Sequence, residues 1–355
     1  MNKYRLQLVG IIGLLAALLV VVSVVVAAPR VGPVVSLKTA QNTFSASQDV
    51  LVTVTISNPT KNSIRILKWF TPSDGVEGSL FNVKRDGNPV AYIGAYYKRP
   101  AITGRDYITL KAGESLTRVV NLGDYYDLSV SGQYEIQYAV ASTNLFNEKA
   151  SNFKVQDAFS SDAISLKVEG KSSKGKPTPT PTPPPGGNTF DVCSVSQQSY
   201  LIKARADAQT YSSESNSYLY SMLSGSSRYG KWFGAFDRGR VFTVQTHFTA
   251  ITNAFTDAGI LFHCGCKQNY YAYVYPTRPY EIFLCKVFWT APALGTDSKA
   301  GTLIHEMSHF NVVAGTSDYV YGQTGASDLA LTDPARAIMN ADNHEYFAEN
   351  NPSLP

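Results

Sequence analysis

Residues 171–188, KSSKGKPTPTPTPPPGGN, divide the sequence into two unlike halves. Alternating proline and threonine cannot sustain the hydrogen bonding of a helix or a sheet, so an extended, polyproline-like spacer is expected. At 355 residues, the chain also exceeds what one hydrophobic core usually serves. We therefore predict two domains, residues 34–170 and 190–355, joined by a linker at 171–189.

The composition is that of a folded protein. Apolar residues make up 44% of the sequence, and 22 Tyr and 17 Phe supply aromatic surface to bury. The net charge of +4 is too small to indicate a nucleic-acid-binding protein. The charge divides at the linker: from residue 190 onward there are 11 basic and 14 acidic residues, and before it 20 and 13. Opposite signs would favour docking of one domain on the other.

The N-terminus has the pattern of an export signal. A basic MNKYR precedes Leu8–Ala28, an apolar run interrupted by two glycines and a serine. Val26-Ala27-Ala28 offers a small-residue cleavage site, which favours a signal peptide over residues 1–28. Left uncleaved, the 21 residues are long enough to anchor the chain in a bilayer. In either case we expect the remaining chain outside the cytoplasm, secreted or held on the outer face of the membrane.

All four cysteines lie in the C-terminal half, and an even number in an exported chain indicates disulfides. They are Cys193, Cys264, Cys266 and Cys285. A bond between Cys264 and Cys266 would be strained, which leaves two cross-pairings. We favour Cys193–Cys264 with Cys266–Cys285. The alternative, a soft-metal site at C-x-C, lacks further ligands nearby.

The segment before the linker predicts an all-β domain. Alternating runs such as VLVTVTIS (50–57) and YEIQYAV (134–140) are separated by turn-forming stretches such as RDGNP (85–89). Short strands at this spacing are typical of an antiparallel β-sandwich of immunoglobulin type.

After the linker the pattern changes to an α+β order. Residues 194–223 predict a long helix, residues 243–257 a second, and a third begins near Ser298. YYAYVYP (270–276) and IFLCKVFW (282–289) predict strands. YYAYVYP is also a candidate edge strand for an extended peptide substrate, with aromatic core packing as the alternative.

The third predicted helix carries HEMSH at 305–309. His305 and His309 are four residues apart, which puts both imidazoles on one helix face, close enough to share one catalytic Zn²⁺. Glu306 projects beside the metal, where it can take a proton from a water whose pKa the zinc lowers. The alternative is an amphipathic helix whose histidines are satisfied by hydrogen bonds.

A third ligand is expected just downstream. Gly315 can end the helix and turn the chain back towards the metal. Asp318 would complete two histidines and one aspartate and leave a fourth position open. Tyr321 could donate its hydroxyl to the oxyanion that forms during attack on a carbonyl. In the alternative, Asp318 caps a turn and Tyr321 lies in the core.

HEMSH followed by GTSDYVYG resembles the H-E-x-x-H plus G-T-x-D-x-x-Y-G signature of the aspzincins, deuterolysin-like zincin metalloendopeptidases. Most of residues 190–355 is similar to the peptidyl-lysine members, including FWTAPALGTDS (288–298) and MNADNHEYFAENNP (339–352). One departure is Ala314, where relatives often have glycine. Alanine at this position could alter the turn without removing a ligand. The N-terminal half more loosely resembles the β-sandwich pro-regions of bacterial relatives.

The resemblance implies roles for residues at matching positions. Zinc would be bound by His305, His309 and Asp318. Glu306 would be the general base and Tyr321 the transition-state donor. The family's disulfide pairing is the one favoured above.

ADNHEYF (341–347) points to the substrate. Asp342 and Glu345 share a face on a helical turn and could converge on one ammonium group. A narrow site ending in two carboxylates fits lysine. In the resembling lysine-specific enzymes, the matching residues recognise lysine on the carboxyl side of the scissile bond, in the S1′ pocket. The alternative is an ordinary solvated acidic helix start.

The sequence thus predicts an exported zinc endopeptidase that cuts proteins or peptides before lysine, has no nucleic-acid partner, and contacts a membrane only if its N-terminal segment stays uncleaved. We expect the sandwich to be a pro-domain that assists folding and restrains activity, with self-cleavage at Lys171, Lys174 or Lys176. The alternatives are a broad-specificity deuterolysin-like endopeptidase and a surface binding protein with a structural zinc domain. Glu306 and Tyr321 disfavour the last, because neither is needed to hold zinc.

Overall fold

The computed structural model describes residues 32–142, 145–146, 158–169 and 186–355. These described residues belong to one compact unit. The predicted export segment and most of the linker, with its three lysines, lie outside the described residues. No helix in the described ranges is both long and apolar enough to cross a membrane.

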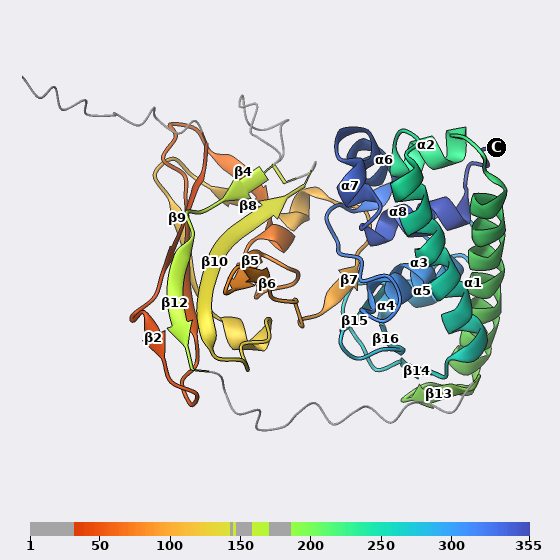
Figure 1. Cartoon of the computed structure of the whole chain (residues 1–355), viewed down its shortest axis with the longest axis horizontal. Helices are drawn as coiled ribbons and strands as arrows, with labels where there is room; N and C mark the ends of the chain where they lie inside the picture. Colours follow the sequence, from red (N-terminus) through yellow and green to blue (C-terminus); the bar gives the residue numbers. More distant parts are fainter. Residues whose placement is uncertain (1–31, 143–144, 147–157, 170–185) are drawn as a thin grey trace, which may run out of the picture. The chain divides into compact units, whose positions relative to one another are not determined.

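The N-terminal part is rich in β-strands (Figure 1). A three-stranded antiparallel sheet has the order β1-β3-β9, with bounds Val34–Lys38, Leu51–Ser57 and Ser115–Asn121. A second sheet has the order β2-β12-β10-β5-β6, with bounds Thr43–Phe44, Ile164–Val168, Gly132–Ala141, Phe81–Arg85 and Asn88–Pro89. Three further strands are β11 (Ala158–Ser160), which pairs with β10, and the pair β4 (Ile64–Leu67) and β8 (Tyr107–Leu110).

The strands bury alternate residues, as the sequence pattern predicts. Val52 and Val54 of β3 and Tyr134 and Ile136 of β10 are fully buried in one core. Short 3₁₀ turns connect the strands: η1 (Lys68–Phe70), η2 (Gly104–Asp106) and η3 (Leu122–Asp124). The prediction of a β-rich N-terminal part is confirmed, whereas the immunoglobulin-like topology and the domain boundaries stay predictions.

The C-terminal part is α+β. Its five-stranded sheet has the order β13-β14-β16-β15-β7, with bounds Asn188–Asp191, Ile260–His263, Glu281–Leu284, Ala272–Val274 and Tyr96–Lys98. The helices, in chain order from α1 to α8, are Val195–Ser221, Ser227–Phe233, Arg238–Asp257, Lys286–Thr290, Lys299–His309, Gly322–Thr332, Pro334–Ala337 and Ala341–Glu349. The three predicted helices correspond to α1, α3 and α5.

The strand predicted over 282–289 is wrong in its second half. β16 ends at Leu284, and α4 begins directly after Cys285. The N–H groups of Lys286 and Val287 donate to the carbonyls of Gln268 and Tyr270 at 3.2 and 3.0 Å, so they are not available for a strand ladder. Tertiary contacts thus override the strand propensity of these aromatic and β-branched residues.

Both disulfides form in the favoured pairing, Cys193–Cys264 and Cys266–Cys285. The first joins the chain before α1 to the residue after β14. The second joins the ends of the segment that contains β15.

A strand from before the linker completes the C-terminal sheet. β7 pairs antiparallel with β15, so residues from the predicted sandwich lie along the YYAYVYP segment. Residues 96–98 belong to the predicted N-terminal domain, and no pattern in the sequence indicates this pairing.

Helices α5 and α8 approach closely at Gly301. The Glu349 side chain at the end of α8 accepts hydrogen bonds from the N–H groups of Asp297 and Ser298 at 3.1 and 2.8 Å. The Ser298 hydroxyl in turn accepts from the N–H of Gly301 at 2.9 Å, which caps α5.

Replacing Gly301 by alanine is expected to lower the free energy of unfolding by about 1–3 kcal/mol, the usual cost of overpacking. The new Cβ would lie 2.6 Å from Cδ of Glu349, which cannot swing away without losing the hydrogen bonds that cap α5. Urea unfolding measures the effect. Gly230→Ala in α2 is the matched control, because a Cβ there meets nothing within 4 Å. Equal stability of Gly301→Ala and the unmodified chain would contradict the expectation.

Candidate active site

Helix α5 brings the two histidines of HEMSH together. Every residue from Ala300 to His309 is buried. His305 and His309 lie one turn apart, and their Nε2 atoms are 3.2 Å from each other. Each imidazole therefore turns the same nitrogen towards one point.

The chain then returns to this point through a turn. Gly315 has φ +60, a left-handed conformation that glycine adopts without strain. The N–H of Thr316 donates to the carbonyl of Ser308 at 3.1 Å, which holds the returning chain against α5. Asp318 Oδ1 consequently lies 3.4 Å from Nε2 of each histidine.

The three side chains fit a zinc ion. His309 Nδ1 lies 2.9 Å from the Thr316 carbonyl and His305 Nδ1 lies 2.8 Å from Asp342 Oδ1. With the ring proton on Nδ1 of each histidine, both Nε2 lone pairs lie near Asp318 Oδ1, a buried oxygen with no hydrogen-bond partner among the described residues. Such a cluster of electron pairs is favourable only around a cation, and two histidines with one carboxylate form a donor set that zinc prefers.

The groups of the cluster also shift one another's pKa values. Burial opposes ionisation of Asp318, but His309 and His305 outweigh it and lower the pKa of that carboxyl. Burial raises the pKa of Glu306 to about 8, with His305 partly opposing the shift. Glu306 Oε1 accepts a hydrogen bond from the backbone N–H of Lys98 at 3.3 Å, and Oε2 has no partner among the described residues.

Tyr321 lies beside Asp318 at the start of α6. Its hydroxyl is 3.4 Å from Nε of Arg99, and its ring packs edge-to-face on Trp69 with centroids 5.2 Å apart. Tyr321 is thus buried in the N-terminal core, as the alternative interpretation expected, while it remains next to the candidate metal ligands.

Helix α8 supplies the two predicted pocket carboxylates, Asp342 and Glu345. Both are fully buried, so the alternative of a solvated acidic helix start is wrong. Asn340 before the helix accepts the N–H of Tyr319 at 2.8 Å and so links α8 to the loop that carries Asp318. Asp342 Oδ2 accepts the N–H of Gly322 at 2.6 Å.

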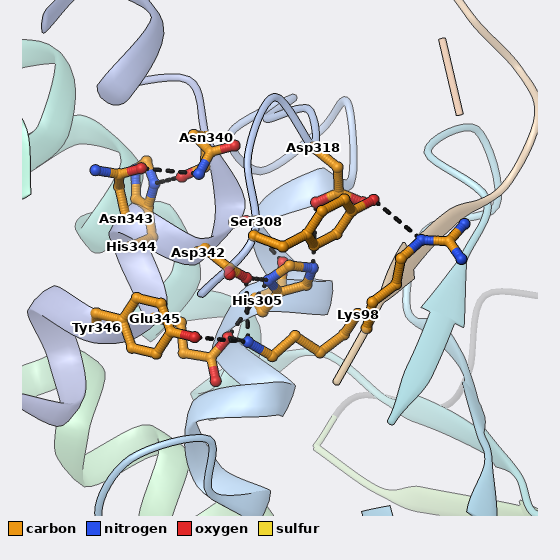
Figure 2. Close-up of polar contacts among 12 residues, drawn as sticks. Lys98, His305, Ser308, Asp318, Asn340, Asp342, Asn343, His344, Glu345 and Tyr346 are labelled. Carbon is orange, nitrogen blue, oxygen red and sulfur yellow. Dashed lines mark hydrogen bonds and ion pairs between the residues drawn. The ribbon is translucent and has the colours of Figure 1, made fainter. Parts of the chain in front are cut away.

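A buried lysine from the N-terminal part fills the space between these carboxylates (Figure 2). Lys98 Nζ lies 2.7 Å from Glu345 Oε2 and 3.1 Å from Asp342 Oδ1. It also lies 3.0 Å from Asp297 Oδ1 and 3.4 Å from the hydroxyl of Tyr346. Burial alone would lower the pKa of Lys98, but Asp342 and Glu345 raise it well above its ordinary value, so the group is an ammonium ion.

Asp342 joins the two halves of the site. One oxygen contacts both the ring of His305 and the Lys98 ammonium, and the other accepts the N–H of the residue after Tyr321. A carboxylate behind a ligating histidine fixes the ring and raises its basicity. The same side chain therefore contacts both the cluster of candidate metal ligands and the Lys98 ammonium.

The structure brings together all seven residues predicted for metal binding, catalysis and lysine recognition. It also adds two that sequence reasoning missed, Lys98 and Asp297. Asp297 lies in FWTAPALGTDS, which the sequence analysis noted without giving it a role. Nothing local marks Lys98.

The remaining buried histidines form a separate pair. His247 Nδ1 and His344 Nε2 are 3.0 Å apart, and His344 Nδ1 lies 3.0 Å from the Asn340 carbonyl. Burial lowers the pKa of His247 to about 4 and of His344 to about 3, so both rings are neutral. They help to hold α3 against α8.

Comparisons with known proteins identify relatives of this chain. The sequence profile of the aspzincin family, described as lysine-specific metallo-endopeptidase, matches residues 218–349. An extracellular protease of Aeromonas hydrophila is 44% identical over 313 residues, 87% of this chain and 90% of that protein. A peptidyl-Lys metalloendopeptidase of Grifola frondosa is 35% identical over 319 residues, 85% of this chain and 88% of that protein.

A solved structure, a zinc peptidase from Grifola frondosa, is 49% identical and covers 46% of this chain and 100% of its own, with a TM-score of 0.45. The similarity to the Aeromonas protease extends over most of both chains. This chain therefore belongs to the aspzincin family of zinc metalloendopeptidases.

Proposed function

We propose that the protein is an exported endopeptidase that hydrolyses the peptide bond on the amino side of lysine. His305, His309 and Asp318 would hold the zinc ion, and Asp342, Glu345 and Asp297 would bind the lysine side chain. Relatives named peptidyl-Lys metalloendopeptidase support this substrate class.

The observation that carries the proposal is the environment of Lys98. Three carboxylates converge on one ammonium group, and all three lie within 3.1 Å of Nζ. A neutral or acidic side chain would leave these carboxylates without a counter-charge, which is strongly unfavourable in a buried site. Two tyrosine rings also attract the ammonium group: Nζ lies 5.0 Å from the centroid of the Tyr346 ring and 5.8 Å from that of Tyr271.

The catalytic roles follow from position. Zinc bound by the three ligands would polarise the scissile carbonyl and make a water molecule more acidic. Glu306 Oε2, which has no other described partner, would take the proton of the attacking water. Glu306 would then deliver the proton to the departing backbone amine of the lysine, since Oε1 lies 3.3 Å from the backbone nitrogen of Lys98. Tyr321 would donate its hydroxyl to the oxyanion once Arg99 no longer contacts it.

Export is part of the proposal. Two disulfides suit an oxidising compartment, and the Aeromonas relative is named an extracellular protease. The leader over residues 1–28 would direct the chain out of the cytoplasm.

Digestion of a denatured, lysine-containing protein by the exported enzyme should give chelator-sensitive cuts with lysine at the new N-termini, mapped by mass spectrometry. The matched control is the same protein with acetylated lysines, which should resist cleavage because its side chains carry no charge. Cuts without lysine preference would support metalloprotease activity but contradict the proposed lysine pocket, and they would indicate a broad-specificity enzyme. No cleavage by folded, zinc-loaded protein, even after Lys98→Ala, would favour a binding protein.

A further inference from the structure

Strand β7 lies where the proposed enzyme would bind its substrate. It pairs with β15 in the register Ala272↔Lys98, Tyr273↔Tyr97 and Val274↔Tyr96. β15 would otherwise be the free edge of the C-terminal sheet. Proteins commonly bind extended peptides by adding a strand to such an edge. Residues 96–98 therefore occupy the path of a substrate.

The backbone of β7 places one peptide unit over the catalytic groups. The N–H of Lys98 donates to Glu306 Oε1 at 3.3 Å, and the N–H of Tyr97 donates to Asp318 Oδ2 at 3.2 Å. When the peptide bond before a lysine is hydrolysed, the backbone nitrogen of that lysine leaves as an amine. The Tyr97–Lys98 bond thus has the position of a scissile bond, with its lysine in the pocket.

Residues on either side of this bond are anchored as well. The Tyr96 ring stacks on His309, with centroids 4.6 Å apart, and its hydroxyl lies 3.1 Å from Oγ of Ser317. Arg99 pairs with Glu77 at 3.0 Å, and its Nε lies 3.4 Å from the Tyr321 hydroxyl. Arg99 is almost fully buried, so this contact is part of a packed interface.

We propose that the N-terminal part keeps the enzyme latent by holding Lys98 in the lysine pocket as a pseudosubstrate, while Arg99 and Trp69 hold Tyr321. This regulation rests on the proposed lysine-directed activity. Because Lys98 belongs to the same chain, its effective concentration at the pocket is high, and a free peptide competes poorly. Cutting the Tyr97–Lys98 bond would not free the site, since Tyr96 and Arg99 anchor both new ends.

The test compares the intact, zinc-loaded full chain with its Lys98→Ala variant. Initial rates are measured on a short fluorogenic peptide with one lysine, and intact mass confirms that neither chain has been trimmed. Without the ammonium, the docked state leaves buried carboxylates unpaired, so the variant should be about 100-fold faster or more. Lys111→Ala is the control, because that side chain is exposed in the N-terminal part and should leave the chain latent.

Equal rates for the intact unmodified chain and Lys98→Ala would overturn latency. A second peptide with norleucine in place of lysine separates this result from failure of the proposed specificity. If Lys98→Ala accelerates cleavage of both peptides equally, the latency proposal stands and the proposed lysine specificity is wrong.

A binding measurement keeps the test decisive if activity is low. In a Glu306→Gln background, a fluorescent lysyl peptide should bind to the Lys98→Ala chain and not to the chain that retains Lys98. Equal binding to both would overturn the proposal. Lys98→Met, which keeps the alkyl stem and removes the charge, replaces Lys98→Ala in each comparison if the alanine variant does not fold.

Discussion

Glu306→Gln is expected to slow peptide hydrolysis by about 10²–10⁴-fold, the usual contribution of a positioned general base. Glutamine keeps the size of the side chain but cannot accept the proton of the attacking water. Glu306 is not one of the three clustered ligands, so bound zinc should be unchanged. Initial rates per bound zinc, on chains trimmed by the same added protease, measure the effect.

Glu214→Gln on the exposed face of α1 makes the same chemical change away from the site and should leave the rate unaltered. A Glu306→Gln enzyme that turns over lysyl peptides at the original rate would remove Glu306 from the mechanism. Loss of zinc together with activity would instead assign Glu306 to the metal site.

Asp342→Asn should have two effects, because the carboxylate contacts both His305 and the lysine ammonium. Loss of a carboxylate behind a ligating histidine commonly weakens metal binding by about 10–100-fold. Loss of its charge also removes one of three counter-ions from the pocket, so the preference for lysyl over norleucyl peptides should fall. Chelator competition measures zinc affinity, and the ratio of kcat/KM values measures selectivity.

Asp297→Asn is the matched control for this double effect. Asp297 Oδ1 lies 3.0 Å from Lys98 Nζ. Asp297 is not part of either cluster of possible metal ligands around His305, which are His305–His309–Asp318 and His305–Asp342–Glu345. Its substitution should lower lysine selectivity and leave zinc affinity unchanged. If Asp342→Asn and Asp297→Asn behave alike, Asp342 has no separate role behind His305.

The groups of the site that are close in sequence were predictable. HEMSH and Gly315 follow local rules, because a four-residue spacing on a helix and a left-handed turn fix where the next ligand lies. The spacing of Asp342 and Glu345 correctly put both on one helical face, although it could not show that Asp342 also contacts His305. That second contact depends on how α8 packs against α5.

Lys98 escaped prediction because its partners are distant in sequence. Its contacts to Glu306 and Asp342 span 208 and 244 residues, and no periodicity in AYYKRP points to another sheet. The strand predicted over 282–289 failed for a related reason: the carbonyls that bind Lys286 and Val287 belong to the preceding loop. Local propensity determines neither the position of Lys98 nor the point at which β16 ends.

The pairing of β7 with β15 has a further consequence for solubility. While β7 is in place, it pairs with the N–H and C=O groups at the edge of β15, so β15 cannot recruit a strand from another molecule. Without β7, the edge of β15 would be exposed over its three residues, one of which is Tyr273. β7 thus covers an edge at which the C-terminal parts of two copies could otherwise pair.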